Sequence, residues 1–321
     1  MIIHPLSFFK QLWLCFINYG WDVIRYFRYS QMGKAKLNQK QKLARIMAMT
    51  HVIEKGLSLP ETRLGYGQNM VKDLLYLLES GVQDNIFCGE IISTAKSVLM
   101  AYHEFHSKAE YELAGLGKQI QEICTDGALH KTGVMKFTKE QYMANAASSL
   151  SGCIQSRYSL RQFDLAPVPQ ERIIEAIRIA QKTPSVCNRQ SWTVFLVKDF
   201  EKVKAVASLQ SGNRGFGHTV HNFLVVATSL YSFFGIEERN QSFIDGGLYS
   251  MNLLLSLHSL GIGACPLNWS TCVKQDRAMR KLLDIPDFYN IIMIIAVGSI
   301  PEEFEVAVSR RKTLNETVVI I

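Results

Sequence analysis

Several features that would assign this chain of 321 residues to a familiar class are absent from it. It has seven cysteines, an odd number, and no two of them form a CxxC pair. This pattern indicates reduced thiols in a cytoplasmic compartment, not a disulfide framework. There is no internal repeat and no low-complexity linker, and the 48% hydrophobic content is sufficient for a globular protein with a substantial core.

A concentrated patch of charge is also missing. Lys and Arg total 35 against 28 Asp and Glu, a formal charge of +7, but the basic residues are spread along the chain. We therefore expect no nucleic-acid partner, and the charge favours anionic ligands or a membrane surface only weakly.

The first thirty residues lack the features of a transmembrane helix or a signal peptide. Lys10 and Asp22 leave an uncharged run at residues 11–21, whereas a spanning helix needs about 20 predominantly apolar residues. No basic region precedes the apolar part, and no small-residue cleavage site follows it. The segment combines Phe, Trp and Tyr with Lys10, Arg25 and Arg28. It predicts a helix that lies on an anionic bilayer, or equally one that packs on the protein or on a partner subunit.

The segment from residue 31 to residue 149 is predicted to be mostly helical. A first helical pattern ends at Gly56, and a second begins near Asn69 with the spacing of one buried stripe. Further helical patterns cover residues 85–123, and a polar connection follows at 125–133. The boundary near residue 150 is inferred from a change of pattern.

Two histidine pairs lack the companions of a metal site. His103 and His106 in HEFH, and His218 and His221 in HTVH, have i, i+3 spacing, but no Cys or carboxylate set completes a zinc pattern. We expect no metal site here, with these histidines at the surface or supporting their neighbours. The GYG stretch at residues 65–67 is predicted to be a turn.

The stretch CIQSRYSLRQFD carries a more informative pattern. Arg157, Ser159 and Arg161 alternate, so in an extended conformation their side chains project on one side. Two guanidinium groups flanking a hydroxyl suit a phosphate or a polyol chain. Alone, the pattern is equally typical of a surface strand with scattered charges.

A predicted helix in PVPQERIIEAIRIAQKTPSV, with proline at both ends, leads into PSVCNRQSW at residues 184–192. Asn188 and Gln190 offer amide donors and acceptors there, a suitable lining for a planar ligand. The apolar run TVFLV at residues 193–197 predicts a strand, and Trp192 is expected to pack in the core and not against a cofactor.

These elements, in this order, resemble the nitroreductase family of FMN-dependent oxidoreductases. The resemblance continues through IDGGLYSMNLLLSLHSLGIGACPLNW, IIMIIAVGSIP and SRRKTLNETVVI. It implies an α+β fold, a three-layer α-β-α sandwich with a mainly antiparallel central sheet, preceded by an α-helical N-terminal extension. The implied division is an aromatic and basic segment at 1–30, a helical extension at 31–149 and an FMN-binding domain at 150–321.

The resemblance also implies which residues bind FMN. They form one group for the phosphate and ribityl chain, one for the ring, and one loop whose backbone N–H groups approach the reactive ring nitrogen. The members are Arg157, Ser159 and Arg161 with Arg310 or Arg311; Pro184, Ser185 and Asn188 with Gln190 close by; and Pro266, Leu267 and Asn268. The proline that usually follows the glutamine is Ser191 in this chain.

The implied activity is hydride transfer from NADH or NADPH, through FMN, to a small acceptor of nitro, quinone or enone type in a ping-pong cycle. No catalytic side chain is expected, because flavin carries the chemistry. The alternative is a specialised or redox-inactive relative that acts as a flavin-binding or membrane-associated scaffold.

The family further implies an intertwined homodimer with FMN at the subunit interface, and the β-branched C-terminal run suits an exchanged element. The expected location is the cytoplasm, with peripheral contact to the inner face of the membrane through residues 1–30.

Overall fold

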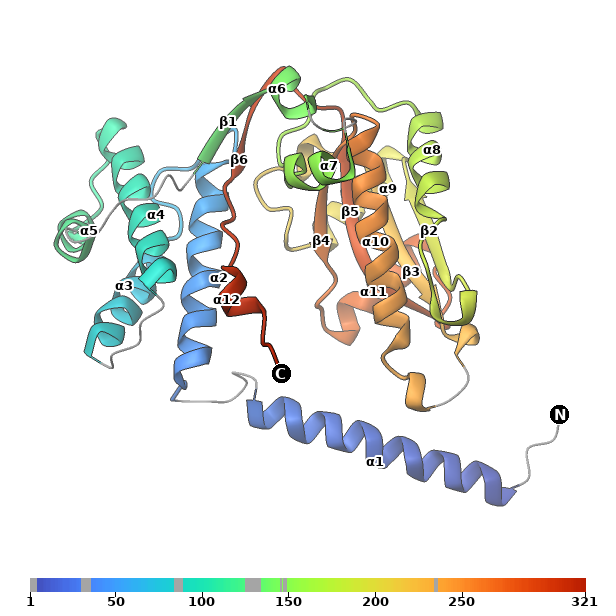
Figure 1. Ribbon diagram of the computed structural model, residues 1–321. Helices are drawn as coiled ribbons and strands as arrows, with labels where there is room; N and C mark the ends of the chain where they lie inside the picture. The colour runs from blue at the N-terminus through green and yellow to red at the C-terminus, as the bar shows by residue number, and fades with distance from the viewer. Residues whose placement is uncertain are drawn as a thin grey trace. The chain divides into compact units, whose positions relative to one another are not determined.

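The structure, a computed structural model, divides the chain into two compact units (Figure 1). It describes residues 5–29, 36–83, 89–124, 134–144, 146, 149–233 and 236–321. Unit 1 comprises Met1–Tyr29 and Phe137–Phe304, and unit 2 comprises Ser30–Lys136 and Glu305–Ile321. This division cuts across the three consecutive segments expected from the sequence, because the first helix groups with unit 1 and the C-terminal residues with unit 2.

A four-stranded antiparallel sheet forms the centre of unit 1. Its strands, in spatial order, are β2 (Trp192–Val197), β3 (Asn222–Ser229), β5 (Tyr289–Gly298) and β4 (Gly263–Asn268). The central strand β3 is buried over nearly its whole length and is apolar on both faces. Such a strand needs cover on both sides of the sheet.

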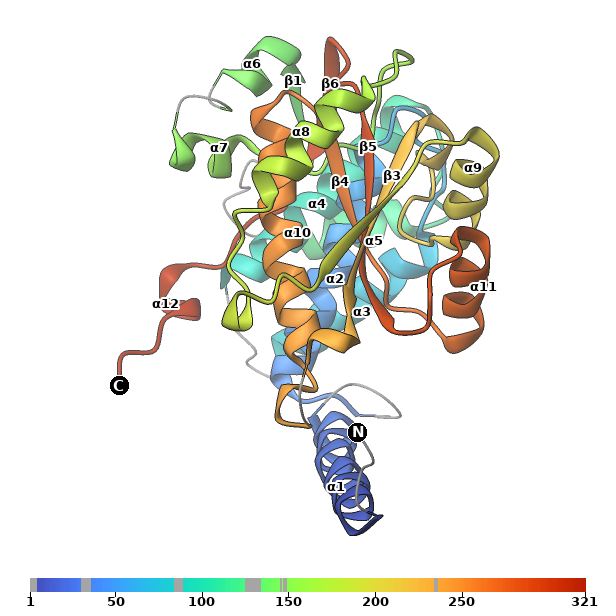
Figure 2. The same cartoon turned by 90° about the vertical axis from the view of Figure 1, so that its right-hand side faces the viewer.

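Helices supply that cover in two layers (Figure 2). On one face lie α8 (Gln170–Ala180) and α10 (Gln241–Ser259), and on the other lie α9 (Phe200–Leu209) and α11 (Val273–Leu283). The expected α+β three-layer sandwich is confirmed. The shorter helices of unit 1 are α6 (Lys139–Met143) and α7 (Leu150–Ser156), and the N-terminal helix α1 spans Pro5–Tyr29.

The core of unit 1 joins α8 and α10 to the sheet. Trp192 stacks on Tyr249 with ring centroids 4.8 Å apart and packs against this core. The prediction that Trp192 is a core residue is confirmed. Asn252 donates from Nδ2 to the carbonyl of Ala180 at 3.2 Å and to Thr183 Oγ1 at 2.8 Å, which ties α10 to the end of α8.

Unit 2 is built from helices around its own apolar core, as the sequence predicts. The helices are α2 (Gln39–Leu57), α3 (Gln68–Gln83), α4 (Gly89–Lys108), α5 (Leu116–Cys124) and the short α12 (Leu314–Thr317). A capping box between Asn38 and Gln41 begins α2. The polar connection predicted at residues 125–133 lies outside the described residues. An unpredicted two-stranded sheet consists of β1 (Val134–Thr138) and β6 (Glu303–Ala307).

The turn at residues 65–67 and His106, for which the sequence predicts no ligand, contact each other inside unit 2. The predicted turn at residues 65–67 is present, and the N–H of Gly65 donates to Nε2 of His106 at 2.9 Å. His106 is fully buried, and its Nδ1 donates to the carbonyl of Tyr102 at 2.7 Å. The imidazole therefore fixes a turn.

No helix within the described residues is long and apolar enough to cross a membrane.

Replacement of Gly263 by alanine is expected to lower the free energy of unfolding by about 2 kcal/mol through overpacking. A Cβ on Gly263 would lie 2.5 Å from Leu160 Cδ2 and 3.0 Å from the carbonyl oxygen of Gly298. Urea denaturation measures the change. The control Gly89→Ala adds a Cβ with no atom within 4 Å and should leave stability nearly unchanged; equal effects of the two substitutions would contradict this packing.

Candidate functional site

The stretch with the R-x-S-x-R pattern runs along the outer edge of β4, directly after α7. The N–H of Leu160 donates to the carbonyl of Ala264 at 3.0 Å, and the Leu160 side chain is fully buried. Alternation in an extended chain then turns Ser159 and Arg161 to the side opposite Leu160. Arg161 donates from Nη1 to the carbonyl of Ser159 at 3.4 Å.

Arg157 carries a charge that the protein around it does not balance. Its Nε and Nη1 atoms are buried and make no hydrogen bond within the described part of the chain. The neighbouring titratable groups are Tyr142, Cys153 and His258. Burial raises the pKa of Tyr142 to about 12 and raises that of Cys153. Burial, with the charge of Arg157 adding to it, lowers the pKa of His258 to about 4.

All three neighbours are consequently uncharged near pH 7. An unpaired buried charge costs several kcal/mol, so this position suits an anion that accepts charge-assisted hydrogen bonds. A phosphate carries the opposite charge, and its oxygens can accept hydrogen bonds from Nε and Nη1 of Arg157.

Two buried side chains bond to the residues on either side of Arg157, one to the Ser156 side chain and one to the Tyr158 backbone. His258 Nε2 lies 2.8 Å from Ser156 Oγ, and Tyr142 donates from its hydroxyl to the carbonyl of Tyr158 at 3.0 Å. The Tyr142 and His258 rings meet edge to face with centroids 4.8 Å apart. Sequence reasoning missed both residues; the available signal was a lone histidine in the apolar run LLLSLHS.

The loop predicted at Pro266, Leu267 and Asn268 is a strand, so that part of the prediction is wrong. These are the last three residues of β4, opposite Ile295, Ile294 and Met293 of β5.

Two protein groups bond to the outer edge of β4 near these residues. The carbonyl of Ala264 points outward to Leu160, so Pro266 and Asn268 also direct their backbone groups outward. The carbonyl of Asn268 accepts from Gln210 Nε2 at 2.6 Å. The outer edge of β4 is thus flanked by the Arg157 segment at one end and by Gln210 at the other.

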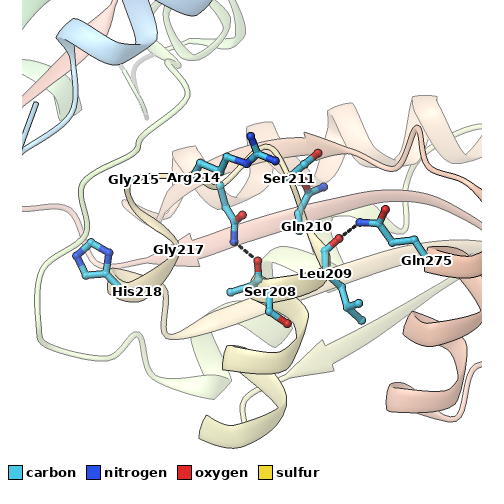
Figure 3. A pocket seen from close by; sticks show the side chains of 11 residues that line it. Ser208, Leu209, Gln210, Ser211, Arg214, Gly215, Gly217, His218 and Gln275 are labelled. Atoms are coloured by element: carbon cyan, nitrogen blue, oxygen red, sulfur yellow. Dashed lines mark hydrogen bonds between the residues drawn. The ribbon is translucent and has the colours of Figure 1, made fainter. Parts of the chain in front are cut away.

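A polar pocket of about 440 Å³ lies beside Gln210 (Figure 3). The end of α9, the following loop and the first turn of α11 form it, and Gln275 donates across it to the carbonyl of Leu209. Arg214 and His218 stand on its loop side. None of the residues predicted to bind FMN lines this pocket.

The second predicted group lies in the turn that precedes β2. Cys187, Asn188 and Gln190 have φ values of 48°, 55° and 47°, in the left-handed region that costs non-glycine residues about 1 kcal/mol or more each. Asn188 and Gln190 are exposed, and Gln190 Nε2 donates to Asn188 Oδ1 at 3.2 Å. The turn therefore presents two linked amides at the surface.

Contacts with neighbouring elements hold this strained turn. Asp245, fully buried at the start of α10, accepts from the N–H of Val186 at 3.3 Å. Ser185 Oγ accepts from the N–H of Gln190 at 2.9 Å. Arg189 makes a paired ion bond with Glu238 at 3.0 and 2.5 Å. Sequence reasoning identified Ser185 but missed both carboxylates.

The structure brings together some predicted site residues and separates others. The Arg157 segment and the end of β4 share one sheet edge, whereas the turn containing Pro184 and Asn188 leads into β2 at the opposite edge. Three strand spacings, about 14 Å, separate the two edge strands. Within a single copy of unit 1, these two predicted groups therefore lie apart.

Arg310 and Arg311 belong to unit 2. Arg310 forms an ion pair with Glu90 at 2.9 Å and donates to Thr94 Oγ1 at 3.2 Å. Arg311 is exposed and donates to the carbonyl of Ser309 at 2.7 Å. Their role toward a phosphate stays a prediction.

Comparison with known proteins matches residues 154–299 to the model of the nitroreductase family. A protein of Archaeoglobus fulgidus, whose name refers to NADH dehydrogenase and NAD(P)H nitroreductase, is 25% identical over 45% of this chain and 82% of its own length. An FMN reductase [NAD(P)H] of Bacillus subtilis is 23% identical over 44% of this chain and 61% of its own. A solved FMN-dependent nitroreductase of Clostridium difficile is 21% identical, with a TM-score of 0.42 over 48% of this chain and 88% of its own.

Acidification is expected to destabilise unit 1 through His258. Its pKa of about 4 in the folded protein lies below the ordinary value of 6.5, so the unfolded chain binds the proton first. The contribution to stability is complete above pH 6.5 and is lost as the pH falls toward 4. Melting temperatures across this range should fall less steeply for His258→Asn than for the unsubstituted protein, with the exposed His218→Asn as control. Equal slopes for all three proteins would refute this assignment.

Proposed function

We propose that the protein is an FMN-dependent oxidoreductase, from the premise that residues 154–299 match the model of the nitroreductase family. In this proposal it takes hydride from NADH or NADPH and reduces a small acceptor of nitro, quinone or enone type in a ping-pong cycle. The observation that carries it is the pair of buried guanidinium nitrogens of Arg157, Nε and Nη1, which have no hydrogen-bond partner among the described residues and lie in the extended R-x-S-x-R segment beside β4. The names of the relatives, which refer to FMN and NAD(P)H, support the choice of cofactor and donor.

The protein's own residues bind and orient the cofactor. Arg157, with Ser159 and Arg161, would hold the phosphate and the ribityl chain through charge-assisted hydrogen bonds. The amides of Asn188 and Gln190 would meet the polar edge of the ring, and the outer edge of β4 would lie beside it. Bound FMN supplies the redox chemistry, accepting hydride from the donor and passing electrons to the acceptor.

The active form we propose is a homodimer, because one copy separates the two predicted groups. The outer face of α10 carries an apolar stripe with the spacing of a single helix face: Phe243, Ile244, Leu248 and Met251, which are 54%, 53%, 47% and 42% exposed. A second copy would cover this stripe and bring its turn before β2 to the Arg157 segment of the first. The exposed C-terminal residues 318–321 and the free edge of β2 are suitable elements for exchange.

We place this activity in the cytoplasm, where NADH and NADPH are found. Reduced thiols suit that compartment. The described cysteines are all free, among them the exposed Cys187 and Cys272.

The absorbance spectrum of the purified protein, before and after anaerobic addition of NADH or NADPH, tests the proposed activity. We expect bound flavin that bleaches, followed by return of colour when a quinone or nitro compound is added. A protein that binds no FMN would refute the proposal, and one whose bound FMN stays oxidised would support the redox-inactive scaffold instead.

Substitution Arg157→Gln tests the phosphate contact. Loss of a charge-assisted pair should weaken FMN binding by about tenfold or more while leaving the affinity for riboflavin, which has no phosphate, unchanged. Fluorescence titration with both flavins measures this, with Arg277→Gln on the exposed face of α11 as control. Equal losses for FMN and riboflavin would show that Arg157 does not contact the phosphate.

A charged residue placed in the apolar stripe of α10 should both separate the two subunits and reduce flavin binding. Leu248→Glu is expected to convert the dimer to a monomer in sedimentation velocity and to lower the ratio of flavin to protein, because each site needs both chains. The control Val273→Glu also replaces an apolar residue with an acid, at a 67% exposed position on α11. It should change neither the sedimentation velocity nor the flavin content. A Leu248→Glu monomer with full flavin content would contradict the shared site.

A further inference from the structure

The N-terminal helix α1 turns a long apolar face outward. Its large exposed side chains recur every three or four residues and so form one stripe along the helix. They are Phe9, Leu12, Trp13, Phe16, Ile17, Val23 and Ile24, which are between 42% and 72% exposed.

Two residues on the opposite side of α1 are less exposed than the stripe. Leu14 and Cys15 are half-buried and lie about half a turn away from the stripe in helical register. The helix contacts the short 3-10 helix η4 (Ile236–Glu238) of the same unit. A helix whose role was to pack on its own unit would turn its apolar face inward; α1 has the reverse orientation.

The composition of α1 indicates what covers the stripe. Residues 5–29 contain Lys10, Arg25 and Arg28 against the single acid Asp22. The stripe includes Trp13 and two phenylalanines, and aromatic rings favour the level of lipid headgroups. A seam between two helices instead favours a narrow row of Leu, Ile and Val, whereas this stripe is broad and aromatic.

The dimensions agree with a helix that lies along a surface. Twenty-five residues extend about 37 Å as an α-helix, yet α1 does not qualify as a membrane span. A strongly amphipathic helix of this kind binds in the interface plane, with its apolar face at the boundary of headgroups and acyl chains.

We propose that α1 docks unit 1 on an anionic lipid surface. The stripe enters the acyl boundary, and Lys10, exposed on α1, meets the phosphate groups of the lipids. This docking goes beyond the redox proposal and does not depend on it. The docking helix is nevertheless connected to the proposed flavin site. Helix α1 contacts η4, and Glu238 of η4 forms an ion pair with Arg189 of the strained turn.

Vesicle flotation of the full chain tests the proposal. The protein should float with vesicles of equal parts phosphatidylcholine and phosphatidylglycerol, and much less with phosphatidylcholine alone. The triple variant Trp13→Gln, Phe16→Gln and Ile17→Gln should lower the partition coefficient by at least about tenfold, because it removes the largest apolar groups of the stripe. Lys10→Glu should weaken binding to the anionic vesicles and leave the residual binding to neutral ones unchanged.

The matched control replaces three exposed apolar residues outside α1, Leu165, Val273 and Leu314, with glutamine. This variant should float like the unsubstituted protein, and far-ultraviolet circular dichroism checks that both triple variants fold. Absence of flotation by the full chain overturns the proposal, as does equal loss in the control. Loss of self-association in the α1 variant, without flotation of the unsubstituted protein, would identify a second copy as the occupant and overturn it as well. Flavin bleaching is read separately, so failure of the redox proposal is distinguishable from failure of this one.

Discussion

The two buried, unpaired guanidinium nitrogens of Arg157 are the constraint on which the candidate site depends. The residues on either side of Arg157 are held, Ser156 through its side chain by His258 and Tyr158 through its backbone by Tyr142. The same burial that positions Arg157 keeps those neighbours uncharged, so the charge has no internal partner among the described residues. A bound anion would therefore satisfy a group that the fold leaves unpaired, and ligand binding should stabilise the folded state.

The order of strands determines how such a site is completed. Because β3 and β5 lie between β2 and β4, the Arg157 segment and the strained turn before β2 face away from opposite edges of one sheet. Within one copy, these two groups of the proposed flavin site stay apart. A second copy that supplies the other group of the proposed flavin site would account for both the apolar stripe on α10 and the strained turn. It would cover the stripe, and its interface would maintain a backbone conformation that an isolated loop would relax.

Apolar surface is distributed unevenly over unit 1. The stripe on α10 joins the two groups of the flavin site in the proposed dimer, while the stripe on α1 is aromatic and accompanied by basic residues. These differences in side-chain chemistry argue for different occupants, a protein surface for α10 and a lipid surface for α1. The contact of α1 with η4, and the ion pair of η4 with Arg189, connect α1 to the turn that we propose to be part of the flavin site.

The sequence alone determined the local elements of the protein. Helical periodicity, terminal prolines and short apolar runs predicted α8, β2 and the helices between residues 37 and 123, because these patterns reflect contacts between residues close in the chain. The ordered motifs, from Arg157 to the turn at Asn188, likewise predicted the match of residues 154–299 to the nitroreductase family model. Only the tertiary structure decided that Pro266 to Asn268 end a strand, that His258 and Tyr142 support Arg157, and that the two groups of the proposed flavin site lie on opposite edges. Each of these depends on pairing between segments far apart in the chain, for which local spacing carries no signal.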